Sequence, residues 1–277
     1  MSLLKRLLPS LLRILLLTLV AIVILLLLFQ NKLIYHPHPY APGELAQYPS
    51  VIQLAYTTSQ GPQRAYYLPP RDTPLHRLWV LFPGNGSCAL DWATFADAAP
   101  DSHAGFLMID YPGYGACAGA PSPSAIEESA ESAFTTLAQT LHTTPAALDS
   151  HLGLLCHSLG CATGLNFAIH HPVDRLLLLA PFTSLRAMAR RTVGWPLCYL
   201  LRRNYDNRAR LTQLAARPAP PAITIFHGDA DSTIPISMSE SLAAQFPRLI
   251  TFHPIQGATH NSILSDAAPQ ITAAMHP

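Results

Sequence analysis

The strongest indication of the fold is the segment Leu154-Leu155-Cys156-His157-Ser158-Leu159-Gly160, which runs on into Cys161-Ala162-Thr163-Gly164-Leu165-Asn166-Phe167-Ala168. An apolar run ends in a serine and changes at once into a segment of helical character. This order predicts a strand, a sharp turn and a helix, an arrangement that lifts the hydroxyl of Ser158 above the end of a sheet. Gly160 suits the turn because it has no side chain to collide with the adjoining strand. Taken alone, the motif also fits a buried strand end with an incidental serine.

Two later segments carry the residue types that a reactive serine requires. The apolar run Pro221-Ala222-Ile223-Thr224-Ile225-Phe226 leads into His227-Gly228-Asp229-Ala230-Asp231, and a second apolar run leads into Gly257-Ala258-Thr259-His260. A serine hydroxyl is a poor nucleophile at neutral pH, so it needs a basic histidine, which needs a carboxylate to orient it. The chain order therefore predicts a triad of Ser158, His260 and one aspartate, either Asp231 or Asp229.

Strand-like and helical segments alternate along the rest of the chain. Apolar runs at 78–82, 105–110 and 175–179 alternate with helical patterns at 89–98, 124–141 and 184–201. Ser124-Ala125-Ile126-Glu127 has the pattern of a capping box at a helix start, and the last helix is expected at 262–275. Continuous apolar strands that alternate with helices predict an α/β domain, at 51–277, with a mostly parallel sheet covered on both faces.

Six motifs, in one order, carry a resemblance to a known family. From about Leu54 to the C terminus, the chain resembles the membrane-anchored α/β-hydrolase-domain proteins of the bud-emergence type, which are related to serine aminopeptidase-like hydrolases. Two positions depart from the family pattern, since Pro83 stands in place of histidine and Cys156 in place of glycine. The motifs are Phe82-Pro83-Gly84-Asn85-Gly86, Asp110-Tyr111-Pro112-Gly113-Tyr114-Gly115, His157-Ser158-Leu159-Gly160, Ala180-Pro181-Phe182-Thr183-Ser184-Leu185, the loop from His227 to Pro235, and Gly257-Ala258-Thr259-His260-Asn261.

The resemblance implies a fold and a site. The implied fold is the α/β-hydrolase fold with a short helical cover, and the family spacing favours Asp231 over Asp229 as the acid. An oxyanion hole needs two backbone N–H donors aimed at the developing negative charge, and the resemblance places them at Asn85 and Leu159. No cofactor is expected, and a metal site is not expected because no cysteine or histidine cluster has zinc-ligand spacing.

The N-terminal region predicts a membrane anchor. Residues 1–10 form a basic tail, 11–29 are almost wholly apolar, and 30–50 form a Pro- and Tyr-rich linker. About 20 apolar residues span the hydrocarbon core as a helix. The alternative is a cleaved signal peptide, which would have a shorter apolar core and a small-residue cleavage site. No such site follows residue 29, so an uncleaved signal-anchor is favoured.

Charge around the apolar segment predicts its orientation. Lys5, Arg6 and Arg13 precede or begin the segment, whereas only Lys32 lies close after it. Basic residues favour the cytoplasmic side. The N terminus is therefore expected in the cytoplasm and the catalytic domain on the other side, which is the periplasmic side if the cell is bacterial.

Composition excludes some classes of partner and leaves one question about the cysteines. The net charge of +1 and the 12% of charged residues give no indication of nucleic-acid binding. Neither does the sequence indicate an oligomeric state.

Cys88 and Cys117 each follow the end of one of two neighbouring strands, so a disulfide between them is possible in an oxidising compartment. The alternative is five unpaired thiols.

About forty residues between the runs at 175–180 and 222–227 are expected to form the short cover. Trp195, Leu197 and Leu201 are its apolar candidates for lining a substrate pocket, with ordinary core packing as the alternative. From Phe182 to Tyr205 the chain has no Asp or Glu. A peptidase that recognises a free amino terminus needs a carboxylate there, because a buried unpaired charge is costly.

These observations predict a membrane-anchored serine hydrolase that cleaves a carboxylic ester or thioester through an acyl-enzyme on Ser158. The anchor suggests a lipid-like or acylated substrate. Two alternatives stay open: a peptidase-type amide hydrolase, and a catalytically silent scaffold that binds a ligand or partner, which the departures at Pro83 and Cys156 keep in consideration.

Overall fold

The computed structural model describes residues 2–276, with side chains from Leu7 onward. Within these residues, eight strands form one sheet in the order β1-β2-β4-β3-β5-β6-β7-β8. β1 is antiparallel to β2, and β2 to β4, whereas all the other neighbours are parallel. The strands are β1 (Ile52–Thr58), β2 (Gly61–Leu68), β3 (Arg77–Phe82), β4 (Ala104–Ile109), β5 (Leu152–His157), β6 (Arg175–Leu179), β7 (Ala222–Gly228) and β8 (Ile250–Ile255).

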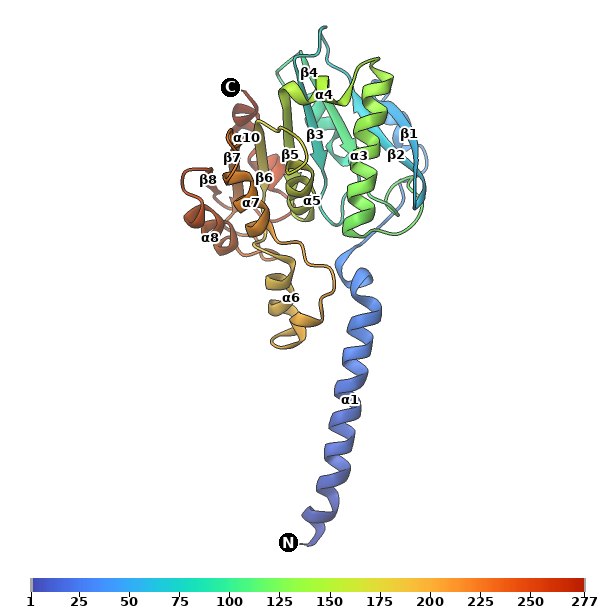
Figure 1. Cartoon of the computed structure of the whole chain (residues 1–277), viewed down its shortest axis with the longest axis vertical. Helices are drawn as coiled ribbons and strands as arrows, with labels where there is room; N and C mark the ends of the chain where they lie inside the picture. Colours follow the sequence, from blue (N-terminus) through green and yellow to red (C-terminus); the bar gives the residue numbers. More distant parts are fainter. Residues whose placement is uncertain (1, 277) are drawn as a thin grey trace.

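Helices cover both faces of the sheet, and the long helix α1 extends away from it (Figure 1). The α-helices are α1 (Ser2–Ile34), α2 (Ala93–Asp97), α3 (Pro123–Thr140), α4 (Pro145–Leu148), α5 (Leu159–Ala168), α6 (Leu185–Val193), α7 (Asn207–Ala215), α8 (Ser237–Gln245), α9 (Ile263–Asp266) and α10 (Ala268–Met275). Short 3₁₀ turns are η1 (Glu44–Gln47), η2 (Ala89–Trp92), η3 (Asp149–His151) and η4 (Leu197–Leu200).

The hydrophobic core has two layers, one on each face of the sheet. Along β3, Val80 and Phe82 belong to the layer beneath α3, α5, α7 and α8, whereas Trp79 and Leu81 belong to the layer beneath η2, α2, α9 and α10. This alternation is the period of two that a strand buried on both faces requires. The expected fold class, a mostly parallel sheet between helices, is confirmed.

Several helix boundaries differ from the sequence prediction. The helical segment expected at 184–201 divides into α6, which ends at Val193 before Gly194, and the separate 3₁₀ turn η4. The helix expected to start at Ser124 begins at Pro123, because proline fits the first helical turn and the hydroxyl of Ser122 accepts the N–H of Ala125. The helix expected at 262–275 is interrupted at Ala267, since Pro269 has no N–H for the preceding turn. Helix α1 continues to Ile34, beyond the expected end at 29.

The cysteines are all free thiols, so the disulfide considered between Cys88 and Cys117 is absent. The two side chains face different surroundings. The thiol of Cys88 is buried beside the carbonyl of His38, at 3.5 Å, and the thiol of Cys117 lies 3.4 Å from the carbonyl of Arg64 on β2.

Cys156, which departs from the family pattern, is accommodated by a glycine on the neighbouring helix. Its side chain is fully buried at the end of β5, where α5 crosses the sheet. A Cβ added at Gly164 would collide with the Sγ of Cys156. The cysteine therefore fits because Gly164 leaves room for it, and the strand, turn and helix around Ser158, here called the elbow, keep their close packing.

We expect Gly164→Ala to destabilise the domain, although alanine is ordinarily the better helix former by about 1 kcal/mol. Overpacking of a core typically costs about 1–3 kcal/mol. In a Cys156→Ala background the clash with Sγ is gone and the tightest remaining contact of the added Cβ is with Phe82 Cδ2 at 3.2 Å, so the same substitution should become much less destabilising. Thermal unfolding midpoints of the two single variants, the double variant and the parent would measure this coupling. Equal effects of Gly164→Ala in both backgrounds would contradict it.

Candidate active site

The loops that follow the parallel strands meet at one edge of the sheet, next to the C-terminal end of α1 (Figure 1). Ser158 lies between β5 and α5 with φ 54° and ψ −115°. A positive φ is strained for a residue other than glycine. The N–H of Ser158 donates to Leu179 O on β6 at 2.9 Å, and Gly160 allows α5 to approach β3, where a Cβ would collide with Phe82 O. The predicted sharp turn is therefore present.

The structure brings Ser158, His260 and Asp231 together. His260 Nε2 lies 2.9 Å from Ser158 Oγ, and His260 Nδ1 lies 2.7 Å from Asp231 Oδ2. The carboxylate selects the tautomer that carries its proton on Nδ1, which leaves the Nε2 lone pair facing the serine hydroxyl. These contacts have the geometry of a nucleophile, a base and an orienting acid.

Asp231 is held by four donors. Its Oδ1 accepts the N–H groups of Thr233 and Ile234, both at 2.8 Å, and its Oδ2 accepts His260 Nδ1. The Nε2 of His227 lies 3.2 Å from the same Oδ2. Burial alone would raise the pKa of Asp231, but the hydrogen bonds from His227, His260 and Ile234 outweigh it and hold the pKa below its usual range. The carboxylate therefore stays ionised beside His260.

His227 is a contact of the site that the sequence analysis did not identify. Its ring is fully buried, and Nε2 also lies 2.8 Å from Ile234 O, while Nδ1 lies 2.6 Å from Ser239 Oγ. It thereby fixes the loop that carries Asp231. In the sequence, His227 is marked by its position near the end of β7, four residues before Asp231, and that position alone does not distinguish a buried contact of the acid from a surface residue.

Asp229, the other candidate acid, has a different contact. Its Oδ1 accepts the N–H of Gly257 at 2.7 Å and so joins the loop after β7 to the loop after β8. Asp229 is exposed, whereas the side chain of Asp231 is only 1% exposed. Of the two aspartates, Asp231 is the one that contacts His260.

His157 supports the loop that carries His260. Its Nε2 donates to the backbone oxygen of His260 at 3.0 Å. Burial, together with the neighbouring His260 ring, lowers the pKa of His157 to about 3. A neutral ring is thus packed against Gly84, where a Cβ would approach His157 Nδ1 within 2.7 Å.

The two expected oxyanion donors lie beside Ser158 in the wall of one cavity. Leu159 is the first residue of α5, so its N–H has no acceptor within the helix. Asn85 lies in the turn after β3, and among the described residues no acceptor for its N–H is found. Pro83 needs no such partner, and its carbonyl accepts the hydroxyl of Tyr111 at 2.8 Å.

The segment that follows α1 braces this turn. The backbone N–H of His36 donates to Asn85 Oδ1 at 3.1 Å, and the hydroxyl of Tyr114 lies 2.9 Å from Asn85 O. Further along, the hydroxyl of Tyr40 donates to Asp110 at 2.8 Å. Burial raises the pKa of Asp110 to about 7, against the opposing effect of its hydrogen bonds from Ala89 and Tyr40. The linker is therefore fixed to the domain beside the site.

A cavity of about 620 Å³ opens above Ser158. The end of α1, the cover formed by α6 and η4, and the loops of the site supply its wall, and no Asp, Glu, Lys or Arg is among the lining residues. Of the three apolar candidates from the sequence, Leu197 and Leu201 line this cavity. Trp195 does not: it is 71% exposed, because the turn after Gly194 directs it outward while the other side of η4 faces the cavity.

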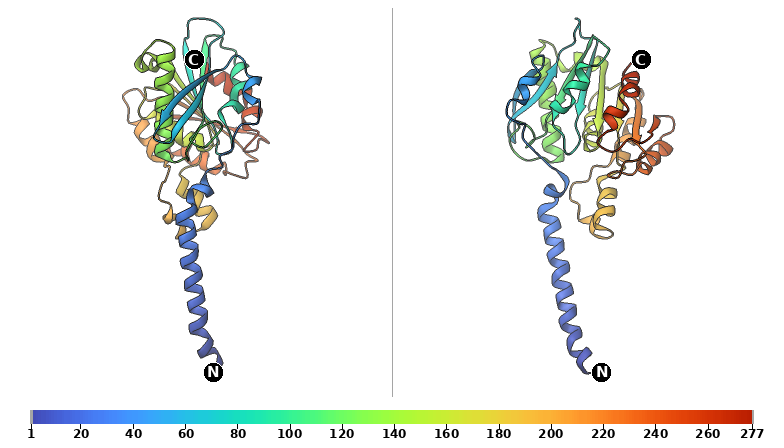
Figure 2. Two further views of the ribbon diagram at one scale, coloured as in Figure 1. Left: turned by 90° about the vertical axis from the view of Figure 1, so that its right-hand side faces the viewer. Right: turned by 180° about the vertical axis from the view of Figure 1, so that it is seen from behind.

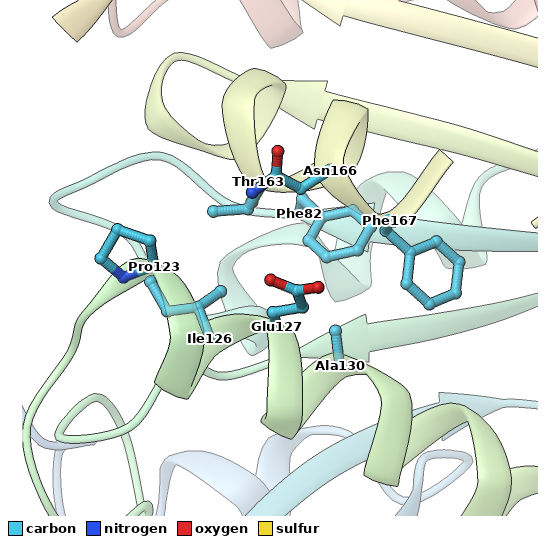
Figure 3. Close-up of a pocket in the computed structure, with 8 residues that line it drawn as sticks. All are labelled: Phe82, Pro123, Ile126, Glu127, Ala130, Thr163, Asn166 and Phe167. Atoms are coloured by element: carbon cyan, nitrogen blue, oxygen red, sulfur yellow. The ribbon is translucent and has the colours of Figure 1, made fainter. Parts of the chain in front are cut away.

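A second cavity lies between α3 and α5 (Figure 3). It measures about 10 Å³, roughly the space of one water molecule, and contacts none of Ser158, Asp231 and His260. In the part of the chain that the structure describes, no group of three or more His, Cys, Asp or Glu side chains is placed to hold a metal ion.

Comparisons with known proteins agree with the fold. A model of the alpha/beta hydrolase family matches residues 79–257. An uncharacterized protein of Mycobacterium tuberculosis is 26% identical over 234 residues, which cover 84% of this chain and 80% of that protein. An alpha-beta hydrolase of Vibrio vulnificus superposes with a TM-score of 0.69 at 16% identity, covering 89% of this chain and 92% of that one. A serine hydrolase without a lid from Xanthomonas campestris superposes with a TM-score of 0.57 at 15% identity, covering 82% and 92%.

Proposed function

Because the chain belongs to the alpha/beta hydrolase family, we propose that it is a serine hydrolase that cleaves a carboxylic ester or thioester through an acyl-enzyme on Ser158. The observation that carries the proposal is the continuous contact from Ser158 Oγ through His260 to Asp231 at the floor of an open cavity. Fold alone does not assign an activity, whereas this geometry supplies a nucleophile, its base and the group that orients the base.

The reaction proceeds in two halves. Ser158 Oγ attacks the carbonyl carbon while His260 Nε2 takes its proton, and the N–H groups of Asn85 and Leu159 receive the developing oxyanion. His260 then protonates the departing alcohol or thiol, which leaves the acyl group on Ser158. In the second half, water attacks the acyl carbon while His260 takes a proton from it. The bond between that carbon and Ser158 Oγ then breaks, His260 returns the proton to Oγ, and the acid is released. Asp231, ionised throughout, stabilises the imidazolium in both halves.

The lining of the cavity favours an ester over a peptide substrate. No charged side chain lines it, so a free ammonium group would have no partner there, and a buried unpaired charge is costly. A silent scaffold is the weaker alternative. Ser158 keeps a strained φ of 54° and its contact with His260, and a binding scaffold has no use for that strain.

For the proposed ester specificity, we expect faster hydrolysis of medium-chain p-nitrophenyl esters than of aminoacyl p-nitroanilides. Each buried methylene of an acyl chain adds about 0.8 kcal/mol of binding, whereas the ammonium group of an aminoacyl anilide adds a desolvation cost. Comparison of kcat/KM for the two substrate series decides between them. Faster cleavage of an aminoacyl anilide would favour the peptidase-type alternative.

We also propose that α1 anchors the protein in a membrane. Residues Leu7–Ile34 are long and apolar enough to cross one, with a mean hydropathy of 3.1 in the most apolar window. The charge asymmetry of Lys5, Arg6 and Arg13 against Lys32 favours a cytoplasmic N terminus and a catalytic domain on the opposite side. A retained signal-anchor also fits the contacts that the end of α1 makes with the domain.

With this topology, protease added outside intact spheroplasts should digest the catalytic domain and spare a cytoplasmic marker protein. The physical reason is that α1 carries the rest of the chain across the bilayer. Immunoblotting against a C-terminal tag measures the digestion, with lysed cells as the control. Protection of the domain until lysis would reverse the orientation.

A further inference from the structure

The C-terminal end of α1 packs against the catalytic domain along one face. Leu26, Gln30 and Ile34 are partly buried and border the cavity above Ser158, while Leu25, Leu28 and Phe29 are exposed. This spacing of four residues is that of one helical stripe. Figures 1 and 2 show the end of α1 beside the cover that contains α6 and η4. The last turns of α1 therefore belong to the wall of the domain.

Gln30 fastens α1 to the cover through both ends of its amide. Its Nε2 donates to Leu200 O at 3.1 Å, and its Oε1 accepts the N–H of Arg202 at 2.8 Å. Two hydrogen bonds from one side chain fix both the rotation of α1 about its axis and its position along that axis relative to η4. A helix that served only as a flexible membrane anchor would not require these bonds.

The same face of α1 forms part of the cavity above Ser158. Leu26, Leu33 and Ile34 line it together with Met188, Val193 and Leu197 of the cover. The apolar wall therefore continues from the nucleophile onto a helix that we have placed in the bilayer. Twenty-eight residues at about 1.5 Å each give a helix of about 42 Å, against a hydrocarbon core of about 30 Å.

The cover presents the residue types found at a membrane surface. Trp195 and Tyr199 are 71% and 64% exposed, and four arginines of the cover are exposed with them. Aromatic side chains gather at the level of lipid head groups, and arginine pairs with phosphate. The arginines are Arg190, Arg191, Arg202 and Arg203. The polar residues Gln30, Asn31 and Lys32 of α1 also fit the head-group level. This placement puts Leu26 on the side of the hydrocarbon core and Ser158 on the side of the water.

From these observations the structure assigns α1 as one wall of an acyl-binding subsite. The substrate class is a long-chain acyl ester of a bilayer amphiphile, whose chain enters between α1 and the cover and lies along Leu26 while its carbonyl reaches Ser158. This assignment rests on the proposed function, since it uses the same nucleophile. It makes the anchor a part of the substrate site.

The first test narrows the subsite with Leu26→Trp and compares it with Leu28→Trp, which lies on the same helix but is 72% exposed. The readout is kcat/KM for butanoyl and dodecanoyl p-nitrophenyl esters, with the full chain in vesicles. Each methylene excluded from the cavity costs about fourfold. We expect Leu26→Trp to lose tenfold or more on the dodecanoyl ester and less than twofold on the butanoyl ester, and Leu28→Trp to change neither.

A second variant keeps the assignment testable if Leu26→Trp does not fold. Gln30→Ala removes both bonds to the cover, and Lys32→Ala is its exposed control. The first should reduce the preference for the dodecanoyl ester severalfold, and the second should not. Unchanged chain-length profiles in both test variants, with butanoyl turnover intact, overturn the assignment of α1. Absence of butanoyl turnover in the parent protein would instead overturn the proposed function.

A separate experiment tests whether the long-chain ester enters the subsite from the bilayer. A long-chain ester lipid that exchanges slowly between vesicles is placed either in the vesicles that hold the protein or in separate ones. We expect hydrolysis to fall at least tenfold when they are separated, while a water-soluble butanoyl ester is hydrolysed equally in both arrangements. Equal hydrolysis of the long-chain lipid would overturn entrance from the bilayer.

Discussion

Ser158→Ala is expected to abolish hydrolysis of short acyl esters while the domain stays folded. Removal of a triad nucleophile typically lowers kcat by about a million-fold, because the base and the oxyanion hole have no attacking atom to assist. Ser158 is 8% exposed at the floor of the cavity, and its Oγ contacts His260 Nε2. Loss of the hydroxyl leaves the elbow backbone, Cys156 and Gly160 unchanged, so no large change in stability follows.

The measurement combines turnover, labelling and folding. Steady-state hydrolysis of a butanoyl ester gives kcat, and a fluorophosphonate probe should label the parent protein but not the variant. Ser124→Ala, on the first turn of α3, is a matched control that should keep both activity and labelling. Ser158→Gly should be as inactive as the alanine variant but slightly more stable, since glycine adopts a φ of 54° without strain. Turnover like that of the parent protein in Ser158→Ala would exclude the nucleophile.

The fold could be predicted from the sequence wherever short-range patterns determine it. Continuous apolar runs and helical segments gave the parallel strands, and the order of Ser158, an acidic residue and His260 along the chain indicated which loops meet. Strand ends in a parallel sheet converge on one edge, so these contacts follow from topology. The helix that starts at Pro123 instead of Ser124 shows the limit of this reasoning. Ser122 and Ser124 are both residue types that cap helices, and the folded structure uses Ser122.

The contacts that escaped prediction join residues far apart in the sequence. Gln30 reaches the cover across 170 positions, and His36 reaches Asn85 across 49. No periodicity or motif encodes such pairs. The placement of α1 against the cover therefore appears only in three dimensions. His227 was missed for a different reason, because a histidine at a strand end has no local pattern that separates a buried donor from a surface residue.

The second large effect is expected for Asp231→Asn, which should lower kcat by about ten-thousand-fold. The side-chain amide of asparagine can turn an N–H group toward His260, which then favours the tautomer with its proton on Nε2. That ring cannot accept the proton of Ser158. The substitution also removes the negative charge that stabilises the imidazolium of the reaction.

Asp229→Asn is the matched control, because it changes the same chemical group two residues away in the same loop. Asp229 contacts the N–H of Gly257 and not His260, and an asparagine oxygen can still accept that bond. Its effect on kcat should therefore stay within a few-fold. Steady-state kinetics with a butanoyl ester, together with the thermal midpoint of each variant, separates a catalytic loss from unfolding. Equal losses in the two variants, or a larger loss for Asp229→Asn, would show that His260 is oriented by a group other than Asp231, and the reaction scheme would need a different acid.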